Sequence, residues 1–492
     1  MAHYLGLDIG TSAVKALICD ETQTVVAEHS APLAISRPQP LWSEQSPADW
    51  ITAVEGVLDH FHVQAPGALA DVRAIGLSGQ MHGATMLDAT DQPVRPAILW
   101  NDGRAHGECA VLSALHPALA EIAGVVPMPG FTAPKLVWMA RHEPQAFARI
   151  RCVLLPKDYV GLFLTGERVT EMSDAAGTWW LDEARRAWSR DLLAATGMRI
   201  EQMPRLIEGS AVAGTLRSSL AARWGMRSDV VVAGGAGDAA AGGIGLGAID
   251  EGAAFISLGT SGQLFVTNTS YRPSVKNLVH TFAHCIPGRW FQMAAMLNGA
   301  SCLSFVAGLL QDGVGGLIAE AQKNYQGPGD LIFLPYLAGE RTPHNDAHAR
   351  GVLFGLTPGT SRASLMQAAM EGVAYSFADA LQCVEAAGSP VGSAAVIGGG
   401  AQSAFFVQTL SNVLDRPLLR YQGGEKGPAF GAARLARLAH TGETPEAVCT
   451  LPPVLDLTHP DARLVAAYKP RIEQFRRLYK ALKPEFARIG AA

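Results

Sequence analysis

The chain has 492 residues, more than one hydrophobic core usually spans, so we expect two or more domains. Its 39 basic and 44 acidic side chains exclude a broad cationic face, and no apolar run reaches membrane length, so we expect neither nucleic-acid nor membrane partners. Seven cysteines without a CxxC pair, and an N-terminus without a secretory signal pattern, favour reduced thiols and a cytoplasmic location.

The first predicted element is a β-hairpin at residues 5–15, which read LGLDIGTSAVK. Two β-rich runs flank Gly10-Thr11-Ser12, where a tight turn needs glycine and small hydroxyl residues. Asp8 precedes the turn and Lys15 follows it, a grouping that suggests phosphate and metal chemistry. It is no P-loop, because neither the G-x-x-x-x-G-K-[ST] spacing nor a following helical pattern is present.

The core of this hairpin recurs half a chain later, where residues 255–266 read FISLGTSGQLFV. Gly259-Thr260-Ser261 again lies between β-rich runs, so we expect a second hairpin of the same kind. Two copies at this spacing predict two similar domains, each opening with the hairpin. We place the boundary at residue 248, which gives domains 1–248 and 249–492.

The two copies differ at one informative position, since aligning them sets Ser257 against Asp8. A structural turn does not need that acid. Two hairpins that face each other across a cleft would offer N–H and hydroxyl groups to one polyphosphate, and Asp8 would hold the accompanying Mg²⁺. This geometry is typical of the actin-like (ribonuclease-H-like) ATPase fold, with the active site in the cleft between its two domains.

Alternating segments along the rest of the chain predict an α/β fold. We expect a C-terminal helix with a charged outer face in the last fifty residues. The other predicted strands cover residues 72–79, 151–156, 330–337 and 394–397, and the other predicted helices cover residues 47–61, 364–388 and 403–415.

Asp238 is the strongest single candidate for catalysis. It follows a β-branched run that indicates a buried strand, and the glycines around it allow a close backbone approach. A carboxylate among residues too small to cover it should point into an open cleft. The alternative is an N-cap for the alanine-rich helix that follows, but a cap does not require those glycines. We assign Asp238 as the general base that accepts the proton of a substrate hydroxyl late in phosphoryl transfer.

Polar side chains follow two further strands. In SGQMHGAT, Gln80 and His82 are flanked by glycines and expected to be exposed at a strand end, and Met81 offers an apolar contact. A purely structural histidine is the alternative. The segment AILWNDGR then supplies Trp100 and Arg104. Strand-end groups from successive β-α units converge on one cleft, and an aromatic face with donors and acceptors is typical of sugar binding.

Two other motifs carry weaker signals. Gly399 and Gly400 lie in a glycine run between a strand and a helix, where a planar ligand can lie against the backbone, although a tight turn explains the run equally well. His280 and His284 have the spacing of a helical metal pair, but their surroundings indicate a strand, where that spacing separates them. We therefore expect no zinc site there.

Longer blocks extend these motifs over essentially the whole chain: DIGTSAVK, PLWSEQ, GQMHGAT, RPAILWNDGR, MPGFTAPKLVW, LLPKDY, MSDAAGT, SLGTSG, LPYLAGERTPHN, EGVAY and IGGGA. With them the sequence resembles the FGGY family of carbohydrate kinases. The GFTAPKLVW block is similar to the family's first signature. The QMHG and GERTPHN blocks are similar to the branch that phosphorylates D-xylulose, rather than to the glycerol, gluconate or ribulose branches.

The resemblance implies phosphorylation of D-xylulose to D-xylulose 5-phosphate, with ATP and Mg²⁺ and with a homodimer as the oligomeric state. It implies Asp238 as proton acceptor and Asp8 as the acid near the metal. The sugar contacts that it implies are Met81, His82, Trp100, Arg104 and Asp238. The nucleotide contacts that it implies are the two turns, Gly10, Thr11, Ser12, Gly259, Thr260 and Ser261, then Lys15, and Gly399 and Gly400 at the adenosine.

The sequence departs from the family pattern at three places. Ala239 stands where members that act on xylulose often have a sugar-contacting asparagine, the motif before it is GGAGD rather than GGGD, and Ser364 interrupts the second signature although Glu371 is in place. A kinase of another ketose or polyol, of the ribulose or ribitol type, therefore stays open. So does a nucleotide-switched binding protein of actin-like fold, against which the sugar-type strand ends argue.

Overall fold

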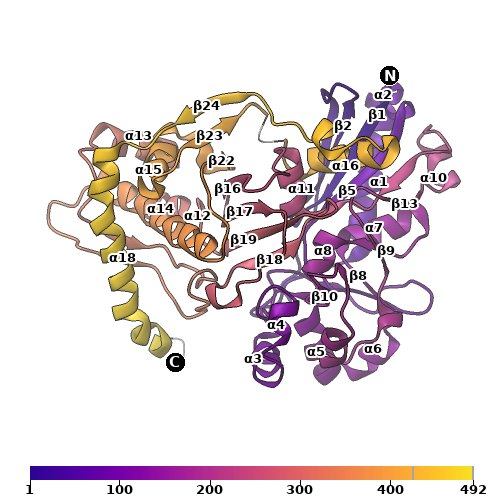
Figure 1. The fold of residues 1–492 in the computed structure, drawn as a ribbon, viewed down its shortest axis with the longest axis horizontal. Coiled ribbons are helices and arrows are strands. Elements are labelled where there is room, and N and C mark those ends of the chain that lie inside the picture. The colour runs from indigo at the N-terminus through magenta and orange to yellow at the C-terminus, as the bar shows by residue number, and fades with distance from the viewer. Residues whose placement is uncertain (424–425, 490–492) are drawn as a thin grey trace.

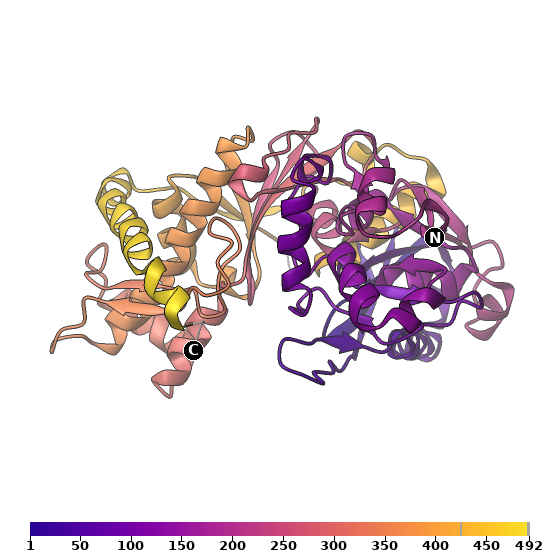
Figure 2. The same cartoon turned by 90° about the horizontal axis from the view of Figure 1, so that it is seen from below.

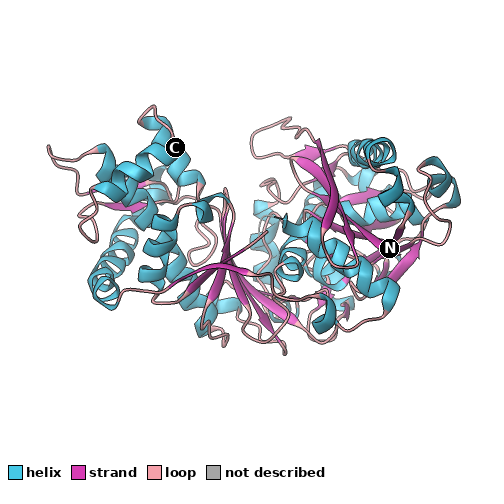
Figure 3. Ribbon diagram, turned by 90° about the horizontal axis from the view of Figure 1, so that it is seen from above, coloured by secondary structure: helices cyan, strands magenta, loops and turns pink. Residues whose placement is uncertain are grey.

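The structure, a computed structural model, describes residues 1–423 and 426–489. Within those residues, two seven-stranded sheets form the centres of two lobes (Figure 1), visible as separate magenta fans in Figure 3. The first sheet consists of β1 (His3–Ile9), β2 (Ala13–Asp20), β3 (Val25–Pro32), β5 (Val72–Gly79), β13 (Val212–Thr215), β14 (Val231–Ala233) and β15 (Ala236–Gly237). The second consists of β16 (Ala254–Leu258), β17 (Gly262–Asn268), β18 (His280–Ala283), β19 (Trp290–Met296), β22 (Ala394–Ile397), β23 (Leu418–Tyr421) and β24 (Val454–Thr458).

The two sheets repeat one topology. In the first sheet, β1 pairs antiparallel with β2 and parallel with β5, β2 pairs antiparallel with β3, and β5 pairs parallel with β14. In the second, β16 pairs antiparallel with β17 and parallel with β22, β17 pairs antiparallel with β19, and β22 pairs parallel with β23. Both predicted hairpins are therefore confirmed, and each occupies the same position in its sheet.

Short strand pairs and helices surround the sheets. The pairs are β4 (Glu44–Gln45) with β7 (Ala97–Ile98), β6 (Thr85–Leu87) with β8 (Cys152–Leu154), β9 (Val169–Glu171) with β12 (Arg205–Ile207), β10 (Leu181–Asp182) with β11 (Ala187–Trp188), and β20 (Ile332–Leu334) with β21 (Val352–Phe354). Helices of the first half are α1 (Pro47–Gln64), α2 (Pro66–Ala70), α3 (His106–Leu115), α4 (Leu119–Ile122), α5 (Thr132–His142), α6 (Pro144–Arg149), α7 (Pro156–Thr165), α8 (Met172–Ala176), α9 (Arg190–Ala195), η1 (Ile200–Gln202), α10 (Ser218–Arg223) and α11 (Asp238–Gly245). Those of the second half are η2 (Val275–Asn277), α12 (Ser301–Leu309), α13 (Val314–Lys323), α14 (Arg362–Ala386), η3 (Gly399–Gln402), α15 (Ala404–Leu414), α16 (Gly427–Thr441), α17 (Pro445–Val448) and α18 (Ala462–Ile489).

The long predicted helices are confirmed as α1, α14, α15 and α18. In α1, Trp50, Val54, Leu58 and Phe61 recur at three- or four-residue spacing and are buried, which gives the helix one apolar face toward β2 and β3. The strands predicted at 151–156 and 330–337 shorten to three residues each. Among the described residues no single helix is long and apolar enough to cross a membrane, and the one helix pair that passes by length and composition, α12 with α13, is bent by 88°.

Helices α11 and α16 lie between the two sheets. Although α16 comes late in the chain, it packs on β1 and β5 of the first sheet, and the yellow helix beside the indigo strands in Figure 1 shows this crossing. Glycine permits the close approach, since a Cβ on Gly76 would lie 1.8 Å from the carbonyl oxygen of Ala432. The boundary at residue 248 stays a prediction, and α16 is a later segment that joins the first lobe. In Figure 2, by contrast, α18 lies at the outer end of the second lobe.

Candidate active site

Two adjoining cavities lie where the lobes meet, and both are lined by Asp238, Ala239 and Gln263. We call them the apolar cavity and the polar cavity after their lining residues. The apolar cavity, of about 180 Å³, is lined by Asp238, Ala239, Gly242, Gly245, Leu246, Phe255, Ser257, Gln263, Ile397, Gly423, Lys426, Gly427 and Pro428. The polar cavity, of about 190 Å³, is lined by Thr11, Met81, His82, Trp100, Asp238, Ala239, Ser261, Gln263, His280, Met293, Ala295, Met296, Leu297 and Arg341.

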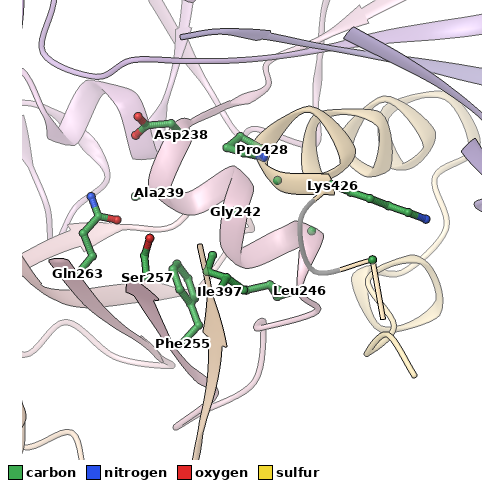
Figure 4. A pocket seen from close by; sticks show the side chains of 13 residues that line it. Asp238, Ala239, Gly242, Leu246, Phe255, Ser257, Gln263, Ile397, Lys426 and Pro428 are labelled. Carbon is green, nitrogen blue, oxygen red and sulfur yellow. The ribbon is translucent and has the colours of Figure 1, made fainter. Parts of the chain in front are cut away.

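The apolar cavity has two unlike ends (Figure 4). Asp238 and Gln263 lie at one end, Phe255 and Ile397 lie toward the other, and Ser257 lies beside Phe255. A cavity with one apolar end and one hydrogen-bonding end suits a ligand that has a flat base and a charged tail, such as a nucleotide.

Asp238 is the first residue of α11, directly after Gly237. The N-cap position belongs to Gly237, so the capping alternative for Asp238 does not apply. The Gly237 N–H donates to the Ser173 hydroxyl over 3.1 Å, and that hydroxyl in turn donates to the carboxylate of Glu171 at 2.9 Å. Burial raises the pKa of Asp238 to about 7, and the Asp8 carboxylate adds to the rise. The result is a carboxylate on an anchored backbone, with a proton affinity that suits a general base.

Asp8 is also buried, at 8% exposure, and lies opposite Lys15 in the hairpin register. Its Oδ1 has no hydrogen-bond partner among the described residues. Burial raises the pKa of Asp8 to about 6, while Ser78 and Lys15 act in the opposite direction. An unpaired carboxylate oxygen beside the phosphate-type turn fits a hard cation such as Mg²⁺. Within the described part of the chain, no group of three or more histidine, cysteine, aspartate or glutamate side chains forms a protein-only metal site.

The first turn is tied to its neighbours. The Thr11 hydroxyl donates to Gln80 Oε1 at 3.0 Å and accepts from the indole N–H of Trp100 at 2.9 Å. Gln45 donates to the Thr11 carbonyl at 2.7 Å and also accepts from Gln80 at 2.8 Å. Thr11 and Trp100 line the polar cavity. The hydroxyl of Thr11 is thus occupied within the protein, and it orients the indole against the cavity.

The prediction that Gln80 and His82 are exposed is wrong, since their exposures are 1% and 8%. Gln80 is enclosed by its bonds to Thr11 and Gln45, and the segment that enters α5 covers His82. These covering contacts come from residues distant in the sequence, so the flanking glycines did not reveal them.

His82 is nevertheless presented to the polar cavity, in a fixed state. Its backbone has φ +68°, and its carbonyl accepts bonds from Thr132 at 3.1 Å and Lys135 at 2.8 Å, which offset the cost of that conformation. Burial holds the pKa of His82 well below its usual value, so the ring is neutral. Nδ1 lies 2.7 Å from the Gly177 carbonyl, which only accepts, so Nδ1 carries the hydrogen and Nε2 is an acceptor.

Other predicted site residues lie elsewhere. Arg104 does not line either cavity; its guanidinium donates to Asp102 at 2.8 Å and to Glu44 at 2.6 Å and stacks over Trp42. The remaining predicted site residues outside the two linings are Asp8, Gly10, Ser12, Lys15, Gly259, Thr260, Gly399 and Gly400.

The sequence did not indicate three polar residues of the polar cavity, which are Gln263, His280 and Arg341. The sequence offers His280 only as half of a metal pair, and its placement on β18 agrees with the predicted strand. Arg341 belongs to the GERTPHN block, which carries no predicted role. The signal was present in these blocks, but the sequence alone did not reveal that they face Asp238.

Comparison with known proteins shows the family of the chain. Residues 3–245 match the N-terminal domain of the FGGY family of carbohydrate kinases, and residues 254–440 match its C-terminal domain. A xylulose kinase of Escherichia coli (strain K12) is 47% identical over 98% of this chain and all of its own. The crystal structure of a xyloylose kinase from Brucella ovis has TM-score 0.95 and 47% identity, covering 98% of this chain and 99% of its own. A xylulose kinase structure from Rhodospirillum rubrum has TM-score 0.90 and 28% identity, covering 99% and 100%.

The two lobes have one topology, and both glycine-threonine-serine turns contribute to the cavity that Asp238 lines. This arrangement defines a kinase of the actin-like ATPase fold. The chain belongs to the FGGY family of carbohydrate kinases.

Proposed function

We propose that this kinase transfers the γ-phosphoryl group of ATP to D-xylulose and forms D-xylulose 5-phosphate and ADP. One observation carries the proposal: Asp238 lines both cavities, so a ligand in either reaches the same carboxylate. The names of the relatives supply the sugar, and the polar cavity, with neutral imidazoles, an indole and a guanidinium, suits a polyhydroxylated molecule.

In this reaction the C5 hydroxyl of the sugar attacks the γ-phosphorus, the bond from phosphorus to the β–γ bridging oxygen breaks, and Asp238 takes the hydroxyl proton. An alcohol is far less acidic than a carboxylic acid with a pKa of about 7, so proton transfer follows the start of P–O bond formation. Such a base contributes about 10²- to 10⁴-fold to the rate.

The turns and Asp8 would serve the nucleotide. Thr260 and Ser261, together with the backbone N–H groups of both turns, would bind phosphate oxygens. Asp8 would hold Mg²⁺ through its unpaired Oδ1. When bound there, Mg²⁺ supplies charge neutralisation on the phosphates. Ile397 lines the apolar end just before Gly399 and Gly400, so we place the adenosine along this segment.

The test is a coupled ADP assay with D-xylulose, D-ribulose, L-ribulose, ribitol and glycerol at matched concentrations. We expect kcat/KM to be highest for D-xylulose, by about tenfold or more over the other sugars. A higher value for another ketose or polyol would contradict the assignment of the sugar. ADP release that no sugar accelerates would contradict a kinase and favour a nucleotide-switched protein.

One observation favours a second candidate, a kinase with altered ketose preference. Ala239 lines both cavities, so the family's frequent asparagine is missing at a position that a ligand can touch. If this candidate is right, Ala239→Asn should lower the KM for D-xylulose while the KM for ATP changes little. A rise in the KM for D-xylulose, with improved turnover of no other pentulose, would show that alanine already suits D-xylulose and would contradict this candidate.

A further inference from the structure

His280, on β18 of the second lobe, is an imidazole that the fold leaves without partners. It is 1% exposed, and neither ring nitrogen has a hydrogen-bond partner among the described residues. Burial lowers the pKa of His280 to about 3, and Arg341 acts in the same direction, so the ring is neutral. Buried polar nitrogens are normally paired, and one that lines a ligand cavity finds its partner in the ligand.

Aromatic packing connects this ring to His82. Phe131 packs against both histidines, with its ring centroid 4.6 Å from His82 and 5.6 Å from His280. Phe282 contacts His280 at 5.4 Å. The polar cavity therefore has one imidazole from each lobe, held by a shared phenylalanine.

We propose that His280 is a sugar-binding and specificity-determining residue, which hydrogen-bonds a hydroxyl of the uncharged ketose from the second lobe. The proposal rests on the proposed function, because it names a contact to that substrate. The two histidines complement each other chemically. His82 presents only an acceptor, because its Nδ1–H is bound to Gly177. His280 is not fixed in either tautomer, so it can donate from one nitrogen and accept at the other.

The chain offers a matched control four residues further on. His284 is 0% exposed, its pKa is lowered to about 3, and its Nε2 has no partner in the described residues, so its burial and charge resemble those of His280. Its ring packs against Phe265 and Phe291, and its Nδ1 accepts the Ile286 N–H at 3.2 Å. His284 does not line the polar cavity.

The experiment is a thermodynamic cycle between the side chain and the sugar. The wild-type enzyme, His280→Ala and His284→Ala are assayed with D-xylulose and with its 1-deoxy, 3-deoxy and 4-deoxy analogues. For the wild type we expect kcat/KM to fall about tenfold for the analogue that lacks the contacted hydroxyl. His280→Ala should lose about tenfold on D-xylulose, chiefly in sugar KM, and lose nothing further on that one analogue. His284→Ala should discriminate among the sugars as the wild type does.

If His280→Ala still discriminates against all three analogues as the wild type does, the assignment is overturned. If His280→Ala unfolds at the assay temperature, His280→Gln, which keeps a donor and an acceptor, replaces it. The assignment then requires His280→Gln to change the discrimination against one analogue only, and equal changes for all three would overturn it. Failure of the proposed function looks different, because the wild type itself would not turn over D-xylulose, and the assignment would fall with it.

Discussion

The two glycine-threonine-serine hairpins share a sequence but differ in surroundings. In the first, the strand contributes Asp8, and the Thr11 hydroxyl is occupied by Gln80 and Trp100. In the second, Ser257 replaces the acid and Thr260 is exposed. The second turn is supported from behind, through its backbone, since the Thr260 carbonyl accepts from Ser301 at 2.6 Å.

This difference shows that one turn sequence can serve two tasks. Local sequence sets the hairpin, and the neighbouring strand ends set its role. In the proposed mechanism, the first turn connects Asp8, the proposed metal ligand, to Trp100, the proposed sugar contact, whereas the second turn offers the hydroxyls of Thr260 and Ser261 to the phosphates.

Asp238 belongs to neither hairpin. Because it is the proposed general base, its loss should lower activity more than any change in the hairpins. We expect Asp238→Asn to lower kcat by about 10²- to 10⁴-fold with the KM for ATP nearly unchanged. The control is Asp229→Asn, a change at an exposed ion pair with Arg227. Turnover within tenfold of the wild type would show that one of the hairpins supplies the base instead.

Asp238→Asn also tests the raised pKa of Asp238. The pKa of Asp238 rises from 3.8 to about 7 on folding, so between those pH values the folded state keeps a proton that the unfolded chain has released. Ionised Asp238 therefore costs stability, increasingly from pH 4 to 7 and fully above pH 7, and asparagine removes that cost. The Tm of Asp238→Asn should exceed that of the wild type at pH 8, and the difference should shrink toward pH 4. An unchanged difference across this range would contradict the raised pKa.

Asp8→Ser converts the first hairpin to the pattern of the second. We expect a loss of about 100-fold in kcat and a higher Mg²⁺ concentration at half-maximal activity, since the cation loses its only proposed protein carboxylate. Ser257→Ala, at the aligned position, should change activity only a few-fold. Equal losses in the two variants would mean that the acid does not distinguish the hairpins.

The pH profile of kcat/KM should report both acids. With pKa values of about 7 for Asp238 and about 6 for Asp8, log kcat/KM should rise with slope one between pH 6 and 7 and slope two below pH 6. Because the Asp8 charge raises the pKa of Asp238, Asp8→Ser should keep a single limb and move it to lower pH. A profile flat from pH 5 to 8 would contradict these roles.

The sequence predicted the parts of the molecule that depend on local pattern. The hairpins, α1 and the strand before Asp238 follow from periodicity and turn residues, and Met81, His82 and Trp100 do line the polar cavity. Contacts across half the chain could not be read in this way. His280 and Arg341 reach the cavity only because the second lobe meets the first there. Arg104 instead donates to Asp102 and Glu44, which no spacing rule indicates.

Substitution of Thr11 and of Thr260 should have the smallest effect on activity, and it separates the tasks of the two turns most clearly. Thr11→Ala removes hydrogen bonds to Gln80 and Trp100, so the free energy of unfolding should fall by about 1–2 kcal/mol, and the KM for sugar should rise because Trp100 loses its anchor. Thr260→Ala removes an exposed hydroxyl without a protein partner among the described residues. It should leave stability unchanged and raise the KM for ATP about three- to tenfold. Urea unfolding measures the free energy of unfolding of both variants, and two-substrate kinetics measures their KM for sugar and for ATP. If instead Thr260→Ala destabilises the protein, or Thr11→Ala raises the KM for ATP more than that for sugar, the two turns do not divide their tasks as their surroundings suggest.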